Sequence, residues 1–143
     1  MSFLKGLDIS ASALTAQRLR MDVIAENLAN VDTTRTAEGG AYRRRYTVMQ
    51  ENKQNNFGSF MERALGVSSD SGVKVAEIRE DTSPFKLDYN PEHPDANEEG
   101  YVEHPNVDLA VEMIDMMAAT RSYEANITAV NAFKSMALKA LEI

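Results

Sequence analysis

An acidic stretch is the clearest hint of site chemistry in this sequence. Asp95, Asn97 and Glu99 place side-chain oxygen atoms at its first, third and fifth positions, and Gly100 follows at the sixth. This spacing is typical of the start of a calcium-binding loop, which also requires a bidentate Glu at position twelve. Asn106 occupies that position. We therefore expect a solvated acidic loop here rather than a metal site.

The two histidines are the other candidate metal ligands. His93 and His104 are each followed by Pro, and neither HxxxH nor HxH spacing occurs, so a role in turns is favoured over metal binding. The chain has no cysteine, no GxSxG motif, no GxGxxG motif and no P-loop glycine cluster. We predict no enzyme activity, no catalytic residues and no cofactor.

Three consecutive arginines, Arg43 to Arg45, lie between Tyr42 and Tyr46. Arginine and aromatic side chains can stack on bases, so this segment could face RNA. The alternative is one or two solvated ion pairs on a strand. The net charge of −7 favours the second interpretation, because nucleic-acid binding requires a basic excess.

Composition describes a small soluble protein of 143 residues, with 43% hydrophobic residues and 26% charged residues. No apolar run is long enough to cross a bilayer, so we expect no membrane insertion. The N-terminus lacks the apolar core of a secretory signal. Taken alone, these features indicate a cytoplasmic protein. Essentially all of the net acidity lies within residues 61–106, so both ends of the chain are suited to packing.

The N-terminal segment, residues 1–34, is predicted to form a helix that ends near Asn30, because Asn tolerates the left-handed conformation. Arg18 interrupts its apolar stripe, and Ala11 and Ala25 lie on the same face. The stripe repeats every seven residues, at Leu7, Leu14, Met21 and Leu28.

The C-terminal segment, residues 107–143, contains neither Gly nor Pro and predicts a longer helix, with Asn106 as its N-cap. Two interleaved series at sevens indicate coiled-coil packing. They are Leu109, Met116, Tyr123, Val130 and Ala137, and then Met113, Thr120, Ile127, Lys134 and Leu141. The two helices would be about 35 and about 55 Å long, which is awkward for a compact domain of this size.

Residues 35–106 are predicted to form a small β-rich insert with loops. We expect strands at 46–49, at 73–79 and, half-buried, at 85–89. We expect loops at 51–59 and 90–100, a helical turn at 60–65 and turns at 68–72. The predicted fold is therefore mainly α with a small β-rich insert, in which the long terminal helices pack as a coiled coil in a tubular assembly.

Several motifs resemble the bacterial flagellar axial proteins, the rod, hook and hook-associated family, and most closely a proximal rod subunit. The most distinctive is AENLANVDTTRT at residues 25–36. Others are LDISASAL at 7–14, SPFK at 83–86, HPDAN at 93–97, GYV at 100–102, PNV at 105–107 and RSYEAN at 121–126. They occur in the family's order along nearly the whole chain.

The resemblance implies a structural subunit of the basal-body rod in the periplasm, which carries motor torque toward the hook. It implies export through the flagellar type III apparatus without a cleaved signal. The implied partners are further copies of the chain, other rod subunits, the membrane-ring adaptor and the distal rod. An absence of cysteine suits a protein that is exported unfolded.

We expect the terminal helices to pair and to pack against other subunits, so that folding is coupled to assembly. Asn27 and Asn30 could fix the register of this packing. A soluble intracellular coiled-coil dimerising adaptor is the alternative, and a metal-dependent enzyme is a weaker one. The expected assembly-interface residues are Leu7, Leu14, Met21, Asn27, Leu28, Asn30, Leu109, Met113, Met116, Tyr123, Ile127, Val130 and Leu141.

Overall fold

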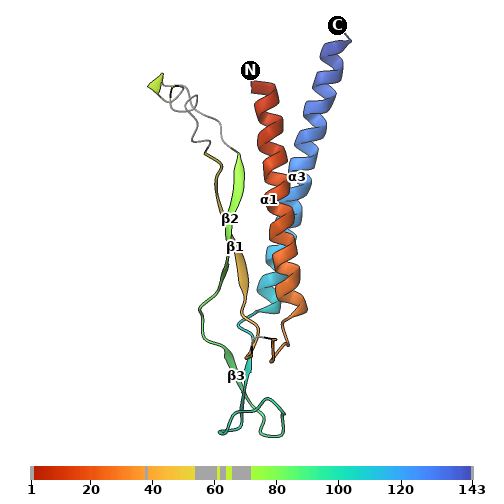
Figure 1. The fold of residues 1–143 in the computed structure, drawn as a ribbon. Helices are drawn as coiled ribbons and strands as arrows, with labels where there is room; N and C mark the ends of the chain where they lie inside the picture. Colours follow the sequence, from red (N-terminus) through yellow and green to blue (C-terminus); the bar gives the residue numbers. More distant parts are fainter. Residues whose placement is uncertain (1, 38, 54–60, 62–63, 66–71, 143) are drawn as a thin grey trace.

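Two long antiparallel helices dominate the computed structural model, and both chain termini lie at the same end of the pair (Figure 1). The structure describes residues 2–37, 39–53, 61, 64–65 and 72–142. Its elements are α1 (Ser2–Ala29), β1 (Arg45–Glu51), β2 (Val73–Glu80), β3 (Lys86–Tyr89), β4 (Tyr101–His104) and α3 (Leu109–Leu141). The chain is thus mainly α with a small β insert, as the sequence predicts. No helix within the described ranges is long and apolar enough to span a membrane.

The side of α3 with the least exposure contains four members of the first predicted series and none of the second. Met116, Tyr123, Val130 and Ala137 are half-buried, as are Leu7, Leu14, Met21 and Leu28 of α1. The second series on this side is Glu112, Ala119, Asn126 and Phe133, of which Glu112 and Ala119 have no exposed surface. Leu109, Met113, Thr120, Ile127, Lys134 and Leu141 are exposed instead. Of the ten positions in the two predicted series, six are therefore exposed in the single chain, where Glu112 and Ala119 occupy the buried side of α3 instead, and packing of the series as a coiled coil stays a prediction.

Both helix boundaries follow local hydrogen bonds. Helix α1 ends at Ala29, as predicted, and the side-chain amide of Asn30 donates to the Glu26 carbonyl at 2.9 Å. Asn30 does not adopt a left-handed conformation, since every described residue with positive φ is a glycine. Asp108, and not Asn106, is the N-cap of α3, and its carboxylate accepts from the Ala110 amide at 3.0 Å.

The β1–β2 ribbon packs along α1. The two strands are antiparallel, pairing Arg45 with Glu80 and Glu51 with Val73, with a bulge between Val48 and Met49. Contacts of both strands with α1 place this helix between the ribbon and α3 (Figure 1). The Val73 amide donates to Ser12 Oγ of α1 at 3.1 Å. Strand β1 extends the predicted strand by one residue at its start and two at its end, and β2 extends its predicted strand by one residue.

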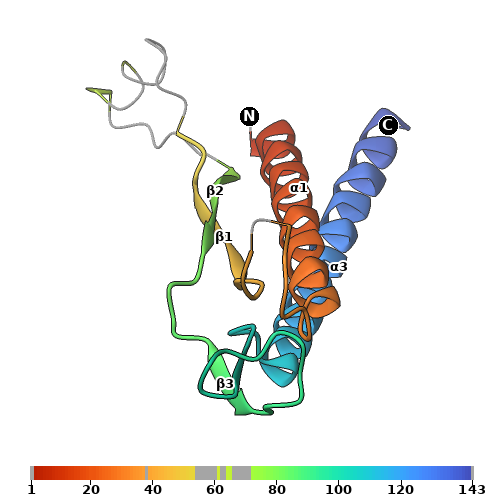
Figure 2. The same ribbon diagram turned by 60° about the horizontal axis from the view of Figure 1, so that its bottom comes forward.

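A second antiparallel ribbon, β3–β4, lies at the end of the helix pair opposite the termini (Figure 2). The sequence did not indicate β4. The prediction that β3 is half-buried is wrong, because Leu87 and Tyr89 are 63% and 64% exposed. Val102 of β4 is buried on the opposite face. Most of the predicted loop at 51–59, helical turn at 60–65 and turns at 68–72 lies outside the described residues.

We expect Gly72→Ala to destabilise the docking of the ribbon on α1. A Cβ at residue 72 would overlap Ser12 Oγ and lie 3.0 Å from Ser12 Cβ, so the Val73–Ser12 hydrogen bond could not persist. A loss of about 1–2 kcal/mol is expected for such overpacking. The measurements are thermal unfolding and hydrogen exchange of the Val73 amide. Adding Ser12→Ala should recover part of the loss, whereas purely additive effects would contradict the steric explanation.

Candidate functional site

A buried asparagine joins three elements at the end of the helix pair away from the termini. Asn27 of α1 has no exposed surface, and its side-chain amide donates to the Arg45 carbonyl at 2.7 Å and to Glu112 Oε2 at 3.0 Å. Its Oδ1 accepts from the Tyr42 hydroxyl at 3.0 Å and from the Arg45 amide at 2.9 Å. Both donors and both acceptor positions of Asn27 are therefore used.

The tyrosine of this network keeps its proton. Burial raises the pKa of Tyr42 above its ordinary value of 10.0, and nearby Arg45 opposes this shift. The neutral hydroxyl is the form that can donate to Asn27.

Glu112 is a buried carboxylate whose charge is balanced by Arg44. Glu112 Oε1 accepts from Arg44 Nε at 2.6 Å, and Glu112 has no exposed surface. We call Asn27, Arg44 and Glu112 the polar node. A carboxylate buried in this way is tolerated only when it is paired and hydrogen-bonded, as here. The node thus requires α1, the segment entering β1 and α3 together.

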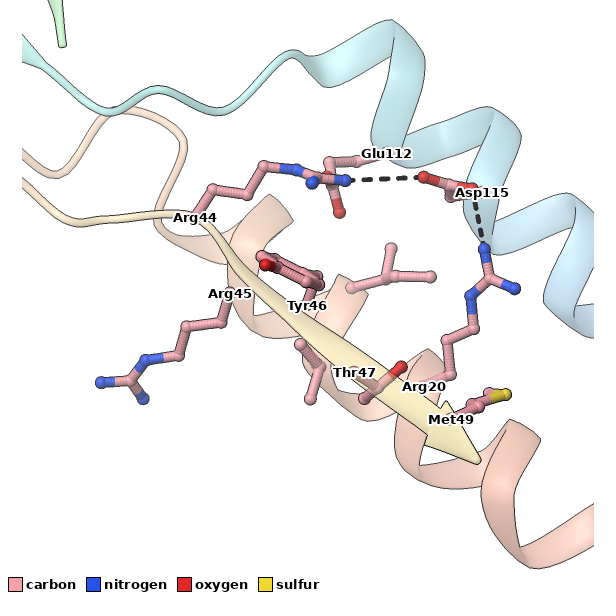
Figure 3. A pocket seen from close by; sticks show the side chains of 10 residues that line it. Arg20, Arg44, Arg45, Tyr46, Thr47, Met49, Glu112 and Asp115 are labelled. Atoms are coloured by element: carbon pink, nitrogen blue, oxygen red, sulfur yellow. Dashed lines mark hydrogen bonds and ion pairs between the residues drawn. The ribbon is translucent and has the colours of Figure 1, made fainter. Parts of the chain in front are cut away.

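Further charges extend the node along α3. Arg44 lies 3.6 Å from Asp115, and Arg20 of α1 donates to the same carboxylate at 2.9 Å. Figure 3 shows Arg44 and Arg20 approaching Asp115 from two sides, beside β1. The backbone amide of Arg44 also donates to Asn106 Oδ1 at 2.8 Å. Asn106 therefore anchors the arginine segment and does not cap α3.

The three arginines all have partners within the chain. Arg43 lies over the Phe85 ring, 4.3 Å from its centroid, and Arg45 lies 3.5 Å from Glu80. Arg45 points away from the cleft in Figure 3. The ion-pair interpretation is thus correct for Arg45, which is solvated. Arg44, in contrast, belongs to the interior, where the sequence did not place it.

An open cleft of 370 Å³ lies between α1, β1 and α3 beside the node (Figure 3). Its charged side chains include Arg20, Arg44, Glu112 and Asp115, which are bonded to one another. Their ionic contacts hold the elements together. The charged side chains that line the cleft therefore have a structural role, which is to join α1, β1 and α3.

The acidic loop uses its polar groups to build turns. Asp95 accepts from the Thr34 hydroxyl at 3.0 Å, and the amide of Asp95 donates to His93 Nδ1 at 3.1 Å. Asn97 Oδ1 accepts from the Glu99 amide at 3.0 Å. His93 therefore has the predicted turn role, but His104 lies in β4. Among the described residues, no three His, Asp or Glu side chains are placed to hold a metal ion.

The expected interface residues divide by exposure. Asn27 is buried within the chain, and Leu109, Met113, Ile127 and Leu141 are exposed. The remainder are half-buried: Leu7, Leu14, Met21, Leu28, Asn30, Met116, Tyr123 and Val130. The sequence singled out Asn27 as a polar residue among apolar ones, but it did not indicate Arg44 or Asp115. Glu112 lies in the first turn of the C-terminal helix, where a negative charge is favourable whether or not it is buried, so the sequence gives no reason to expect its burial.

Comparison with known proteins matches the two terminal segments of the chain to flagellar rod families. Residues 7–35 match the family described as "Flagella basal body rod protein", and residues 98–143 match "Flagellar basal body rod FlgEFG protein C-terminal". These segments contain Asn27 and Glu112, respectively. Arg44, the third member of the polar node, lies outside both matched segments.

Whole-chain relatives agree with these matches. The flagellar basal-body rod protein FlgC of Bacillus subtilis is 52% identical over 149 aligned positions, which cover 100% of this chain and 99% of the relative. FlgC of Borreliella burgdorferi is 46% identical, with 100% and 98% covered. FlgC of Escherichia coli O6:H1 is 43% identical, with the same coverage.

Asn27→Ala should destabilise the chain far more than Asn30→Ala. The first change leaves Tyr42, Arg45 and Glu112 with unpaired buried groups, at a cost of about 3 kcal/mol. The second removes two side-chain bonds near the surface, one donated to the Glu26 carbonyl and one accepted from the Thr33 hydroxyl, at a cost of about 1 kcal/mol. Chemical unfolding followed by circular dichroism measures both. Equal losses would show that the node contributes nothing specific.

Ser83→Ala should raise the pKa of Asp81 toward its ordinary value of 3.8. The Ser83 hydroxyl and then the Ser83 amide stabilise the Asp81 carboxylate and lower its pKa. A lowered pKa contributes stability above pH 3.8 that is lost as the pH falls through the folded-state value. Titration of the Asp81 carboxyl carbon by NMR gives both values. An unchanged pKa in the variant would contradict the role of the hydroxyl.

Proposed function

The chain belongs to the FlgC family of flagellar basal-body rod proteins, and we propose that it builds the rod by packing exposed helix faces against neighbouring subunits. Family membership makes it a structural subunit of the rod, located in the flagellar basal body. A structural role also replaces the alternatives of an intracellular adaptor and a metal-dependent enzyme.

The observation that supports assembly through helix faces is the outward apolar surface of α3. Leu109, Met113, Ile114 and Met117 are 51%, 52%, 62% and 52% exposed, close together near the start of the helix. A contiguous exposed patch of this kind is typical of a protein interface. Methionine side chains adapt their shape to several neighbours, which suits a helical assembly with unequal contacts. The half-buried stripe residues of both helices would complete these contacts.

The helix pair is suited to carry load along a tube. Helix α1 has 28 residues and α3 has 33, so they span about 42 and about 50 Å. The polar node fixes their relative position at one end, and the small residues Gly6 and Ala119 allow close approach along the pair. We infer a tubular, coiled-coil arrangement of such pairs, which transmits motor torque toward the hook.

The incomplete burial of the apolar helix faces also bears on how the chain is exported and assembled. Helices with large exposed apolar faces gain stability mainly from packing, so isolated chains would be only marginally folded. Ordering costs about 1–2 kcal/mol per residue in backbone entropy, and contacts with neighbours offset it. We infer passage of an unfolded chain through the flagellar type III apparatus, followed by folding in the periplasmic rod. Other rod subunits, the membrane-ring adaptor and the distal rod would then be its neighbours.

Met113→Asp and Ile127→Asp should each prevent incorporation into the rod. Both side chains are exposed, so a charge there costs little within one chain but is buried unpaired at an interface. The amount recovered in isolated basal bodies should fall about tenfold or more, and swimming should be lost. Ser135→Asp, at an exposed polar position of the same helix, is the control. Normal incorporation of both variants would contradict packing through this face.

A further inference from the structure

Thioethers are the most readily oxidised side chains of this protein. The sequence contains eight methionines and no cysteine, so no thiol competes with them for an oxidant. Oxidation converts the flexible, apolar thioether into a polar sulfoxide and disrupts methionine-rich contacts. The exposure of each methionine therefore indicates where an oxidant can alter the folded chain.

Exposure divides the methionines of the described residues into two groups. Three of them are half-buried: Met21, Met49 and Met116. The Met21 sulfur accepts a hydrogen bond from the Thr120 hydroxyl at 3.7 Å, so its thioether belongs to the contact between α1 and α3. The other four are 52% or 53% exposed: Met61, Met113, Met117 and Met136. A sulfoxide on any of these four stays hydrated in the single chain and costs little there.

Met113 and Met117 differ from the other exposed methionines in their surroundings. They lie four residues apart on α3, so they share one face of the helix with the exposed Leu109. This is the surface that neighbouring subunits cover in the proposed rod packing. Two sulfoxides would introduce two strongly polar oxygen atoms into that apolar contact, where an unpaired acceptor is costly. Oxidation at these two positions would therefore oppose assembly without opposing the fold of one chain.

We propose that Met113 and Met117 form an oxidation-sensitive site, at which a hydroperoxide modifies the unassembled subunit and thereby prevents its incorporation into the rod. In each reaction the O–O bond of the peroxide breaks and one oxygen atom bonds to the thioether sulfur. With hydrogen peroxide the other oxygen leaves as water. The sulfur loses two electrons and the peroxide gains them. This inference rests on the proposed packing through α3, and in the rod the same packing shields both thioethers.

Competition within one cell tests the site. The wild-type chain and a chain with Met113→Leu and Met117→Leu are produced together, and leucine keeps the volume and apolarity of both side chains. A pulse of hydrogen peroxide is given while rods form, at a dose that oxidises Met113 in most of the unassembled wild-type pool. The ratio of variant to wild type in new basal bodies, measured by mass spectrometry, should rise about fivefold or more over the untreated ratio.

The matched control is Met136→Leu, because Met136 has nearly the same exposure on the same helix but lies 19 residues from Met117. In competition with the wild type, its ratio should not change on treatment. An unchanged ratio for the Met113 and Met117 variant, or an equal rise for the Met136 variant, would overturn the proposal.

A sulfoxide mimic tests the same site without oxidant. Met113→Gln with Met117→Gln introduces neutral polar groups of similar length, and it should lower incorporation about tenfold while helix content by circular dichroism stays that of the wild type. Met136→Gln should have little effect. If Met113→Asp is excluded from basal bodies but the peroxide pulse leaves the ratio unchanged, the oxidation-sensitive site alone is wrong. If Met113→Asp is incorporated normally, the proposed packing through α3 is wrong as well.

Discussion

The hydrogen bond between Asn27 and Glu112 is the contact on which the rest of the structure depends. It joins residues 85 positions apart, and each partner has no exposed surface. The carboxylate is tolerated there because Arg44 balances its charge, and the backbone amide of Arg44 donates to Asn106 Oδ1. Pairing of the two helices without the Arg44–Arg45 segment would leave the buried Glu112 without Arg44 and the buried Asn27 without the Arg45 backbone. Formation of the node therefore couples helix pairing to docking of the β1–β2 ribbon.

Helix content and the main strands could be predicted from the sequence, whereas the contact surfaces could not. The absence of Gly and Pro after Val107, with repeats at sevens, was enough to place α3. The series Glu112, Ala119 and Asn126 on the least exposed side of α3 could not be found from hydropathy. Residues of these types are equally common on protein surfaces. Alternating hydropathy at 85–89 predicted the strand correctly, but the prediction that its apolar face is buried within the chain was wrong. The same alternation is expected for a strand whose apolar face contacts another molecule.

The site shows the same limit at the level of single residues. Asn27 could be singled out from the sequence because a polar amide among apolar residues requires hydrogen-bond partners if it is buried. In the structure its side chain makes four hydrogen bonds. Arg44 could not be separated from Arg43 and Arg45 by type. Their roles differ because the backbone sends one side chain inward to Glu112, one over Phe85 and one to solvent near Glu80. The path of the backbone between α1 and β1 determines which of the three arginine side chains points inward.

Around the start of α3 the distribution of polarity is inverted relative to an ordinary amphipathic helix. Glu112 and Asp115 face the interior of the chain, while Met113, Ile114 and Met117 of the same helix face outward. Buried ion pairs add little net stability but penalise every alternative register, whereas apolar surface adds stability only when it is covered. The inner contacts therefore specify the shape of one subunit, and the outer ones would hold subunits together. In the assembly that we propose, covering this apolar surface would add to the stability of each subunit.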